Sequence, residues 1–242
     1  MSIEQGRITV SGVEVDVLRK PIRNAHLAVY PPNGRVRLAV PLSMSDDAIR
    51  LLVVSKLAWL QRHRRKLETQ EREAPREFVT GESHYFLGRR YLLRVVEGPG
   101  PASVRIMNKR HLVLHTRSGS SKEQREQIMA DWYRSELRAL AATYFAQWTE
   151  AMGVRPSKWG IKVMRTKWGS CNHRSGSIWL NLELARKPVK CVEYIVVHEL
   201  AHLLEHTHNE RFVAYMDRYM PQWRMHRQTL NRLPVRHVDW GY

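Results

Sequence analysis

Cysteine is scarce in this chain of 242 residues, which contains only Cys171 and Cys191 and no Cys-x-x-Cys pair. This usage suits a reducing compartment, although two distant cysteines leave a single disulfide open. Residues 1–10 lack the apolar segment of a secretory signal, and no apolar run approaches the length of a membrane-spanning helix. We therefore expect a cytoplasmic protein with no membrane partner.

Acidic residues are also few, with 23 Asp and Glu against 40 Lys and Arg and a formal net charge of +17. Such a surface attracts polyanions through counterion release. The densest basic run is at 62–66, where the candidate nucleic-acid contacts are Arg62, Arg64, Arg65 and Lys66. No helix-turn-helix, zinc-finger or RNA-binding signature accompanies the run, and a single run is usually a solvated helix face. Nucleic acid is therefore an alternative partner and not a predicted one.

Internal repeats and low-complexity segments are absent as well, so the expected elements rest on hydrophobic periodicity. Alternation predicts strands at 13–18, 26–30, 35–40, 84–97, 103–116, 160–164 and 177–183, with a hairpin turn at 31–34. Helical spacing predicts helices at about 45–73, 121–152 and 191–204, and two more helices follow. These elements predict an α+β fold with a β-rich N-terminal part.

The most informative motif is His198-Glu199-Leu200-Ala201-His202. On a helix, residues four apart lie on one face with Cβ atoms about 5–6 Å apart, so both imidazoles can bind one metal ion. The carboxylate of Glu199 can reach a water on that metal. Residues 191–204 are apolar nearly all round and lack Gly and Pro, which favours a buried helix. Buried His and Glu side chains need a partner, which a metal would supply; a pair of hydrogen-bonded core histidines is the alternative.

A catalytic zinc usually has a third protein ligand, for which His208 is the leading candidate and His206 its competitor. The segment 207–210 has the form of a capping box, which predicts a new helix from about His208 and places that ligand in its first turn. The spacing of the three histidines also matches metzincins. Glu205 stands where metzincins have Gly, so we reject a true metzincin.

Motifs in the C-terminal third resemble those of a known family. Arg165-Thr166-Lys167-Trp168-Gly169-Ser170-Cys171 resembles an R-x-[KR]-W-G-S-C signature, and Ile178-Trp179-Leu180-Asn181 resembles a strand that ends in Leu-Asn. Residues 194–202, and His208 followed by Phe212, match later motifs, with one departure in Thr207 where Asn is usual. The chain thus resembles the YgjP-like metallopeptidases, predicted zinc-dependent hydrolases related to the SprT-like zincin proteases.

The resemblance covers most of the chain, more weakly upstream of 165. It implies a zincin-like catalytic domain in which His198, His202 and His208 are the zinc ligands and Glu199 is the base. We accordingly expect a β-rich region with one basic helix at 1–118 and a zincin-like domain at 119–242.

Substrate contacts are expected near the metal helix, because zincins commonly bind an extended substrate along a neighbouring edge strand. The strand at 177–183 is the candidate, with Trp179 and Asn181, although an ordinary core strand has the same composition. Trp168, Gly169 and Ser170 are further candidates, since Gly permits close backbone approach, whereas Trp168 could simply pack beneath the site. Cys171 is a further metal-ligand candidate, which a complete three-histidine set makes unnecessary. The unranked candidates for an oxyanion donor are Tyr215, His206, His226 and Arg165.

These patterns predict a zinc-dependent metallohydrolase that binds one Zn²⁺ per chain and cleaves a protein or peptide substrate with Glu199 as general base. Two alternatives stay open. One is a basic nucleic-acid-associated protein with a structural or vestigial zinc site, against which the intact Glu199 counts. The other is an enzyme that hydrolyses a non-peptide amide.

Overall fold

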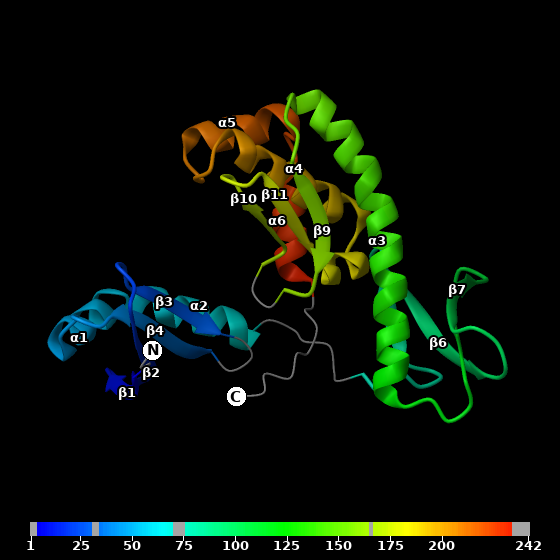
Figure 1. Ribbon diagram of the computed structural model, residues 1–242, viewed down its shortest axis with the longest axis horizontal. Coiled ribbons are helices and arrows are strands. Elements are labelled where there is room, and N and C mark those ends of the chain that lie inside the picture. The colour runs from blue at the N-terminus through cyan, green and yellow to red at the C-terminus, as the bar shows by residue number, and fades with distance from the viewer. Residues whose placement is uncertain (1–3, 31–33, 70–75, 165–166, 234–242) are drawn as a thin grey trace. The chain divides into compact units, whose positions relative to one another are not determined.

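The computed structural model describes residues 4–30, 34–69, 76–164 and 167–233, and it confirms an α+β fold (Figure 1). Its contacts divide the chain into two compact units between residues 73 and 74. The boundary expected at 118 and 119 lies inside the second unit, between a four-stranded sheet and the helix after it. That sheet and that helix share one hydrophobic core, so the division does not fall between them. Among the described residues, no helix is long and apolar enough to cross a membrane.

The first unit combines a four-stranded sheet with two helices. The sheet has the order β1-β2-β4-β3, in which two antiparallel hairpins meet at the parallel pair β2 and β4. Its elements are β1 (Glu4–Val10), β2 (Val13–Lys20), β3 (His26–Tyr30), β4 (Arg35–Pro41), α1 (Asp46–Ser55) and α2 (Leu57–Thr69). The single helix expected at 45–73 is therefore two helices, because the chain turns at Lys56, whose N–H bonds to the Val53 carbonyl; residues 70–73 lie outside the described residues.

The second unit begins with another four-stranded sheet, of order β5-β6-β8-β7. Its strands are β5 (Ser83–Phe86), β6 (Arg89–Glu97), β7 (Ser103–Met107) and β8 (His111–Thr116), so each of the expected strands 84–97 and 103–116 is in fact a hairpin. The long helix α3 (Lys122–Met152) follows and agrees with the prediction. A capping box of Ser121 and Gln124 starts it, and Gly153 ends it in the left-handed conformation, at a φ of 65°.

The two four-stranded sheets repeat one topology. Each consists of two antiparallel hairpins joined at a central parallel pair, and each precedes a helix capped by a serine, Ser45 or Ser121. The first hairpin of each turns through two residues of positive φ: Ser11-Gly12 (49° and 75°) and Leu87-Gly88 (48° and 81°), as type I′ turns require. The chain therefore contains a structural repeat, although its sequence shows no internal repeat.

The rest of the second unit surrounds one buried helix. Its elements are β9 (Lys158–Lys162), β10 (Gly169–Asn172), β11 (Ser177–Asn181), a 3-10 turn η1 (Leu182–Arg186), α4 (Val189–Leu204), α5 (Glu210–Tyr219) and α6 (Trp223–Arg232). The three strands form a sheet of order β10-β11-β9. α4 contacts α3, α5, α6 and β10, which explains why residues 191–197 are all buried and the apolar run has no polar face.

Candidate metal centre

The helix α4 carries the first two histidines of the site. His198 and His202 are one turn apart, and their ring centroids lie 4.9 Å apart at 88° to each other. The helix packs against strand and helix on several sides, so its backbone fixes where both rings can lie. The sequence-based placement of these two side chains on one helical face agrees with the structure.

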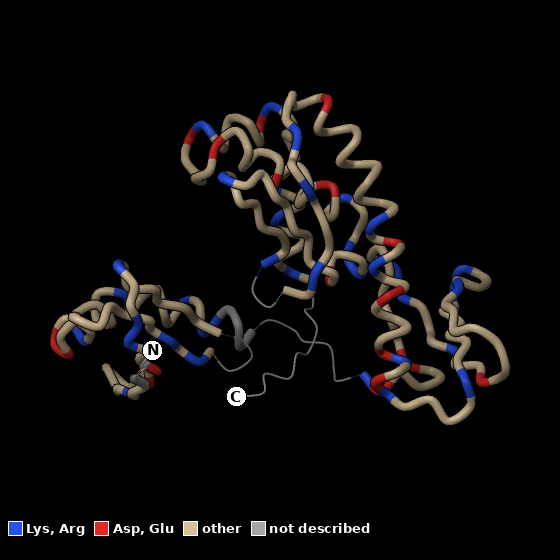
Figure 2. The backbone as a smooth tube through the Cα atoms, viewed as in Figure 1, with Lys and Arg blue, Asp and Glu red and all other residues tan. Residues whose placement is uncertain are grey.

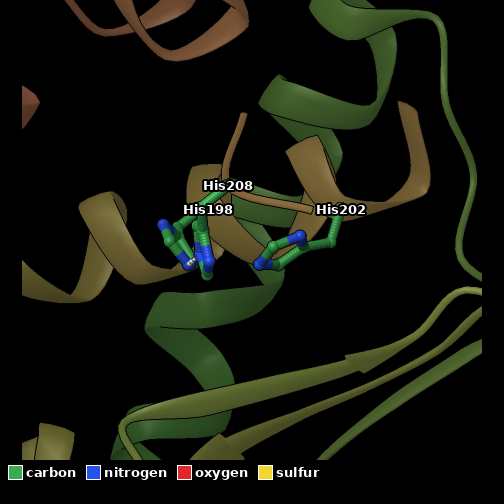
Figure 3. Close-up of side chains that lie close together, drawn as sticks. All are labelled: His198, His202 and His208. Atoms are coloured by element: carbon green, nitrogen blue, oxygen red, sulfur yellow. Dashed lines mark hydrogen bonds between the residues drawn. The ribbon is translucent and has the colours of Figure 1, made fainter. Parts of the chain in front are cut away.

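His208 completes a triad with them (Figure 3). One ring nitrogen of each residue lies within 4.8 Å of the other two, and the Nε2 atoms of His208 and His198 are 3.1 Å apart. Tetrahedral zinc with Zn–N distances of about 2.0–2.1 Å needs nitrogens about 3.4 Å apart, so the triad is close to a coordinating arrangement. His206 is not part of the triad: its side chain is 62% exposed and its ring lies 5.1 Å from that of His173.

The loop that presents His208 differs from the expected capping box. Asn209, and not Thr207, caps α5, and its side chain accepts a hydrogen bond from the Phe212 N–H at 3.0 Å. His208 therefore lies before the helix and not in its first turn. The Thr207 hydroxyl and N–H instead both donate to the Glu205 carboxylate, at 3.1 Å and 3.2 Å, which ties Thr207 to the residue at the end of α4.

Glu205 thus organises the loop from the end of α4. Its N–H bonds to the Ala201 carbonyl at 2.9 Å, and the hydrogen bond from the Thr207 N–H is the main reason why the pKa of its carboxyl is lowered. Its carbonyl oxygen lies 3.2 Å from Nδ1 of His202. A proton on Nδ1 would donate there and leave Nε2 of His202 as the metal-binding nitrogen.

The environment keeps the three imidazoles neutral. Burial lowers the pKa of His198 to about 3 and also lowers the pKa of His202 and of His208. Phe212 packs among them, with its ring centroid 4.7–5.0 Å from each imidazole. Three imidazole nitrogens of lowered pKa around the Phe212 ring are a donor set that suits zinc, so the residues present fit this metal.

Glu199 lies beside the triad as a buried carboxylate. It is 4% exposed, and burial raises the pKa of its carboxyl to about 8, against the opposing effect of Lys167. Its Oε2 has no hydrogen-bond partner among the described residues. Gly169 of β10 packs directly on the carboxylate, because a Cβ at that position would overlap Oε1 and lie 2.8 Å from Cδ. Because glycine has no side chain, Gly169 leaves the space on β10 that the Glu199 carboxylate occupies.

A cleft of about 740 Å³ opens onto the triad and Glu199. Trp168, Gly169 and Ser170 line it, as expected for candidate substrate contacts, and so does Cys171, whose thiol pKa burial raises to about 11. Sequence reasoning did not find Tyr194, Trp223, Arg227 and Asn231, which also line it. Arg227 lies close enough to lower the pKa of both His198 and His208, although burial is the larger cause. α6, which carries Arg227, has no motif that points to the site.

Trp179 and Asn181 are placed differently from the expectation. They lie on β11, which is the central strand and not an edge of its sheet. Asn181 is 4% exposed, and its side-chain amide donates to the carbonyls of Met164 and Lys167 at 2.9 Å and 2.7 Å. The Trp179 ring packs against Gly160. The edge beside α4 is β10, so Asn181 holds the segment that leads into the cleft and does not line it.

The remaining candidates are scattered. Of the four oxyanion candidates, His206 lines the cleft; Tyr215 and His226 do not, and Arg165 lies outside the described residues. In the first unit, Arg62 and Arg65 of α2 are exposed, whereas the stem of Arg64 packs on Gly34, where an added Cβ would lie 2.9 Å from Cγ of Arg64. The side chain of Lys66 lies outside the described residues.

A histidine triad with a neighbouring buried glutamate on an H-E-x-x-H helix is the arrangement of a metallopeptidase. The family model described as "YgjP-like, metallopeptidase domain" matches residues 24–233, and the chain belongs to this YgjP-like family.

Two solved structures are similar to parts of this chain. The metallopeptidase zymogen abylysin of Pyrococcus abyssi is 19% identical, over 39% of this chain and 99% of that one, with a TM-score of 0.35. The metallopeptidase zymogen jannalysin of Methanocaldococcus jannaschii is 18% identical, over 37% of this chain and 92% of that one, with a TM-score of 0.34. No curated protein matches the chain.

Proposed function

We propose that this metallopeptidase is a zinc enzyme that binds one Zn²⁺ per chain through His198, His202 and His208 and uses Glu199 as its general base. The observation that carries the proposal is the convergence of three neutral imidazoles beside a buried carboxylate that makes no hydrogen bond through Oε2. A purely structural zinc site needs no such carboxylate. The alternative of a nucleic-acid-associated protein with a vestigial site therefore leaves Glu199 unexplained.

The roles of the residues follow from this arrangement. When bound, zinc supplies Lewis-acid chemistry that makes water nucleophilic near pH 7. The positive charge of bound zinc would oppose the effect of burial on the pKa of Glu199 and favour its carboxylate. The carboxylate would then accept the proton of the attacking water and deliver it to the leaving amine. Gly169 leaves room for the carboxylate, and Glu205 positions the loop of His208. Arg227 and His206 line the cleft and are the candidates to bind the oxyanion.

The substrate that fits this cleft is an extended peptide. β10 is an edge strand and contacts α4, so its outer backbone groups are available to pair with an added strand. Trp168, Gly169 and Ser170 would then contact the substrate, in a cytoplasmic setting. A compact non-peptide amide would make little use of such an edge.

Metal analysis combined with proteolysis tests the proposal. Purified protein should contain one equivalent of zinc and cleave an unfolded protein; a chelator should abolish cleavage, and added zinc should restore it. Because a formal net charge of +17 would attract polyanions, the assay should be run with and without DNA. Cleavage that survives complete removal of the metal would contradict the proposal.

A further inference from the structure

The outer face of the sheet β5-β6-β8-β7 is strongly basic and lies outside the metal centre. Residues such as Tyr91, Leu93 and Leu112 point to the core, so their neighbours along each strand face outward. The basic residues at the outward positions are Arg90, Arg94, Arg105, His111 and His115, which we call the cationic face. No Asp or Glu occupies an outward position of these four strands. Figure 2 marks Lys and Arg along them.

The register alternates guanidinium groups with rings and apolar side chains. Arg94, Val113 and Arg105 form one cross-strand row, and Leu92, His111 and Met107 form the next. Neighbouring strands are about 4.8 Å apart, so the two arginine Cα atoms are about 10 Å apart. Val113 is 3% exposed although it faces outward, as expected where the aliphatic stems of flanking arginines cover it.

A hollow lies at one end of the same face. It has a volume of about 200 Å³ and is lined by Arg105, His115, Ser103 and the loop at 98–101. These residues offer a guanidinium group, an imidazole and a hydroxyl group beside a loop of alternating Gly and Pro. The face therefore has a recess as well as charge, and none of these residues lines the cleft of the metal centre.

The equivalent sheet of the first unit shows that this topology does not require such a face. There Asp16 forms ion pairs with Arg7 and Arg35, and Arg37 lies over the ring of Tyr30. In the second unit, no ion pair among the described residues involves Arg90, Arg94 or Arg105. Uncompensated arginines cost stability through mutual repulsion. The first sheet pairs two of its arginines with Asp16, whereas Arg90, Arg94 and Arg105 have no acidic partner in the described part of the chain, which points to a role in binding.

We propose that the cationic face binds single-stranded nucleic acid. The arginines would contact phosphates, while Tyr85, His111 and His115 offer rings on which unstacked bases can lie. The major groove of a duplex is about 12 Å wide and admits a helix or a two-stranded ribbon, whereas the face of a four-stranded sheet accepts splayed bases. An acidic protein would use the charges and leave the rings and the hollow without a function.

Fluorescence anisotropy of the full chain with labelled oligonucleotides tests this proposal. Single-stranded RNA, single-stranded DNA and a duplex of one sequence, about 20 nucleotides long, are titrated at several salt concentrations. We expect single strands to bind more tightly than the duplex, and the RNA and DNA arms identify the preferred sugar. The triple variant R90Q/R94Q/R105Q should lose at least about 10-fold in affinity. Each lost phosphate contact lowers the magnitude of the slope of log K against log salt by about 0.7, so three lost contacts should lower it by about 2.

A variant with the same loss of charge provides the control. The triple variant R155Q/K158Q/R174Q removes exposed cations of the second unit that lie off the cationic face, and it should bind within about 2-fold of the wild type. If the triple variant of the face fails to fold, the single variants R94Q and R105Q replace it, each with a smaller loss.

Four results would overturn the proposal. The first is an equal loss of affinity in the face and control variants, and the second is a loss of affinity confined to a variant of Arg62, Arg64, Arg65 and Lys66. The third is no binding by the wild type at low salt. The fourth is that polyglutamate competes as effectively as single-stranded RNA. The last result would indicate an acidic protein as the partner.

Discussion

Replacing Gly169 with Ala should inactivate the enzyme without removing its metal. The three atoms nearest to an added Cβ all belong to Glu199, and none belongs to a histidine of the triad. Cδ of Glu199 would lie 2.8 Å from the new methyl group, well inside van der Waals contact. Glu199 is 4% exposed, so the carboxylate has little free space and must move by about 1 Å.

A displacement of about 1 Å costs about 10²-fold in rate, which is about 2.7 kcal/mol of transition-state stabilisation. The upper limit is the full contribution of a general base, about 10⁴-fold. Turnover of an unfolded protein substrate should therefore fall at least about 10²-fold while bound zinc, measured by elemental analysis, is unchanged. Gly6→Ala is the matched control, because no atom lies within 4 Å of its added Cβ. Wild-type turnover by Gly169→Ala would refute the claim that Gly169 makes room for the base.

Three further predictions follow from other residues. His208→Ala should lose zinc and His206→Ala should keep it; elemental analysis showing the reverse would make His206 the third ligand. Glu205→Ala removes the acceptor of both Thr207 hydrogen bonds, so zinc affinity should weaken about 10–100-fold, and an unchanged Kd in a chelator competition would show that the loop needs no such support. His84 is fully buried, and burial, together with Arg76 and Arg186, lowers its pKa to about 3. The unfolded state then binds more protons than the native state between pH 6.5 and about 3, so stability should fall as pH falls through that window, by up to about 1.4 kcal/mol per pH unit. In urea unfolding, His84→Gln should show a shallower dependence on pH, and parallel curves would contradict this assignment.

Local patterns predicted the parts of the site that one helix determines. The spacing of His198 and His202 fixes their common face on any helix, and the apolar run around them predicts burial. The ends of α3 were equally predictable, because Ser121 with Gln124 and the terminal Gly153 act within one turn. His208 was the preferred third ligand by sequence, but its place in a loop was not predicted. By sequence, the Thr207 hydroxyl can bond either to Glu205 or to the N-terminus of α5. Only the folded structure shows that it bonds to Glu205 and that Asn209 caps the helix.

Contacts between distant segments were not predictable from the sequence. The order β10-β11-β9 decides which strand forms the edge, and composition does not distinguish Trp179 on a central strand from a residue on an edge strand. The packing of Gly169 on Glu199 and the position of Arg227 also depend on tertiary structure. The repeated sheet topology was hidden for a similar reason. The topology needs only alternating apolar residues and a turn glycine, such as Gly12 or Gly88. Two segments of dissimilar sequence can both meet these requirements.

Comparing Glu199→Gln with the wild type at matched zinc content tests the central claim most directly. Gln has nearly the shape of Glu and can still hydrogen-bond to water, but it cannot accept the proton. The account predicts that the variant folds, binds one zinc per chain and loses about 10²–10⁴-fold or more in turnover of an unfolded protein, while its affinity for partners is little changed. Equal turnover by the two proteins would remove Glu199 from the mechanism and contradict a zinc peptidase that works through it.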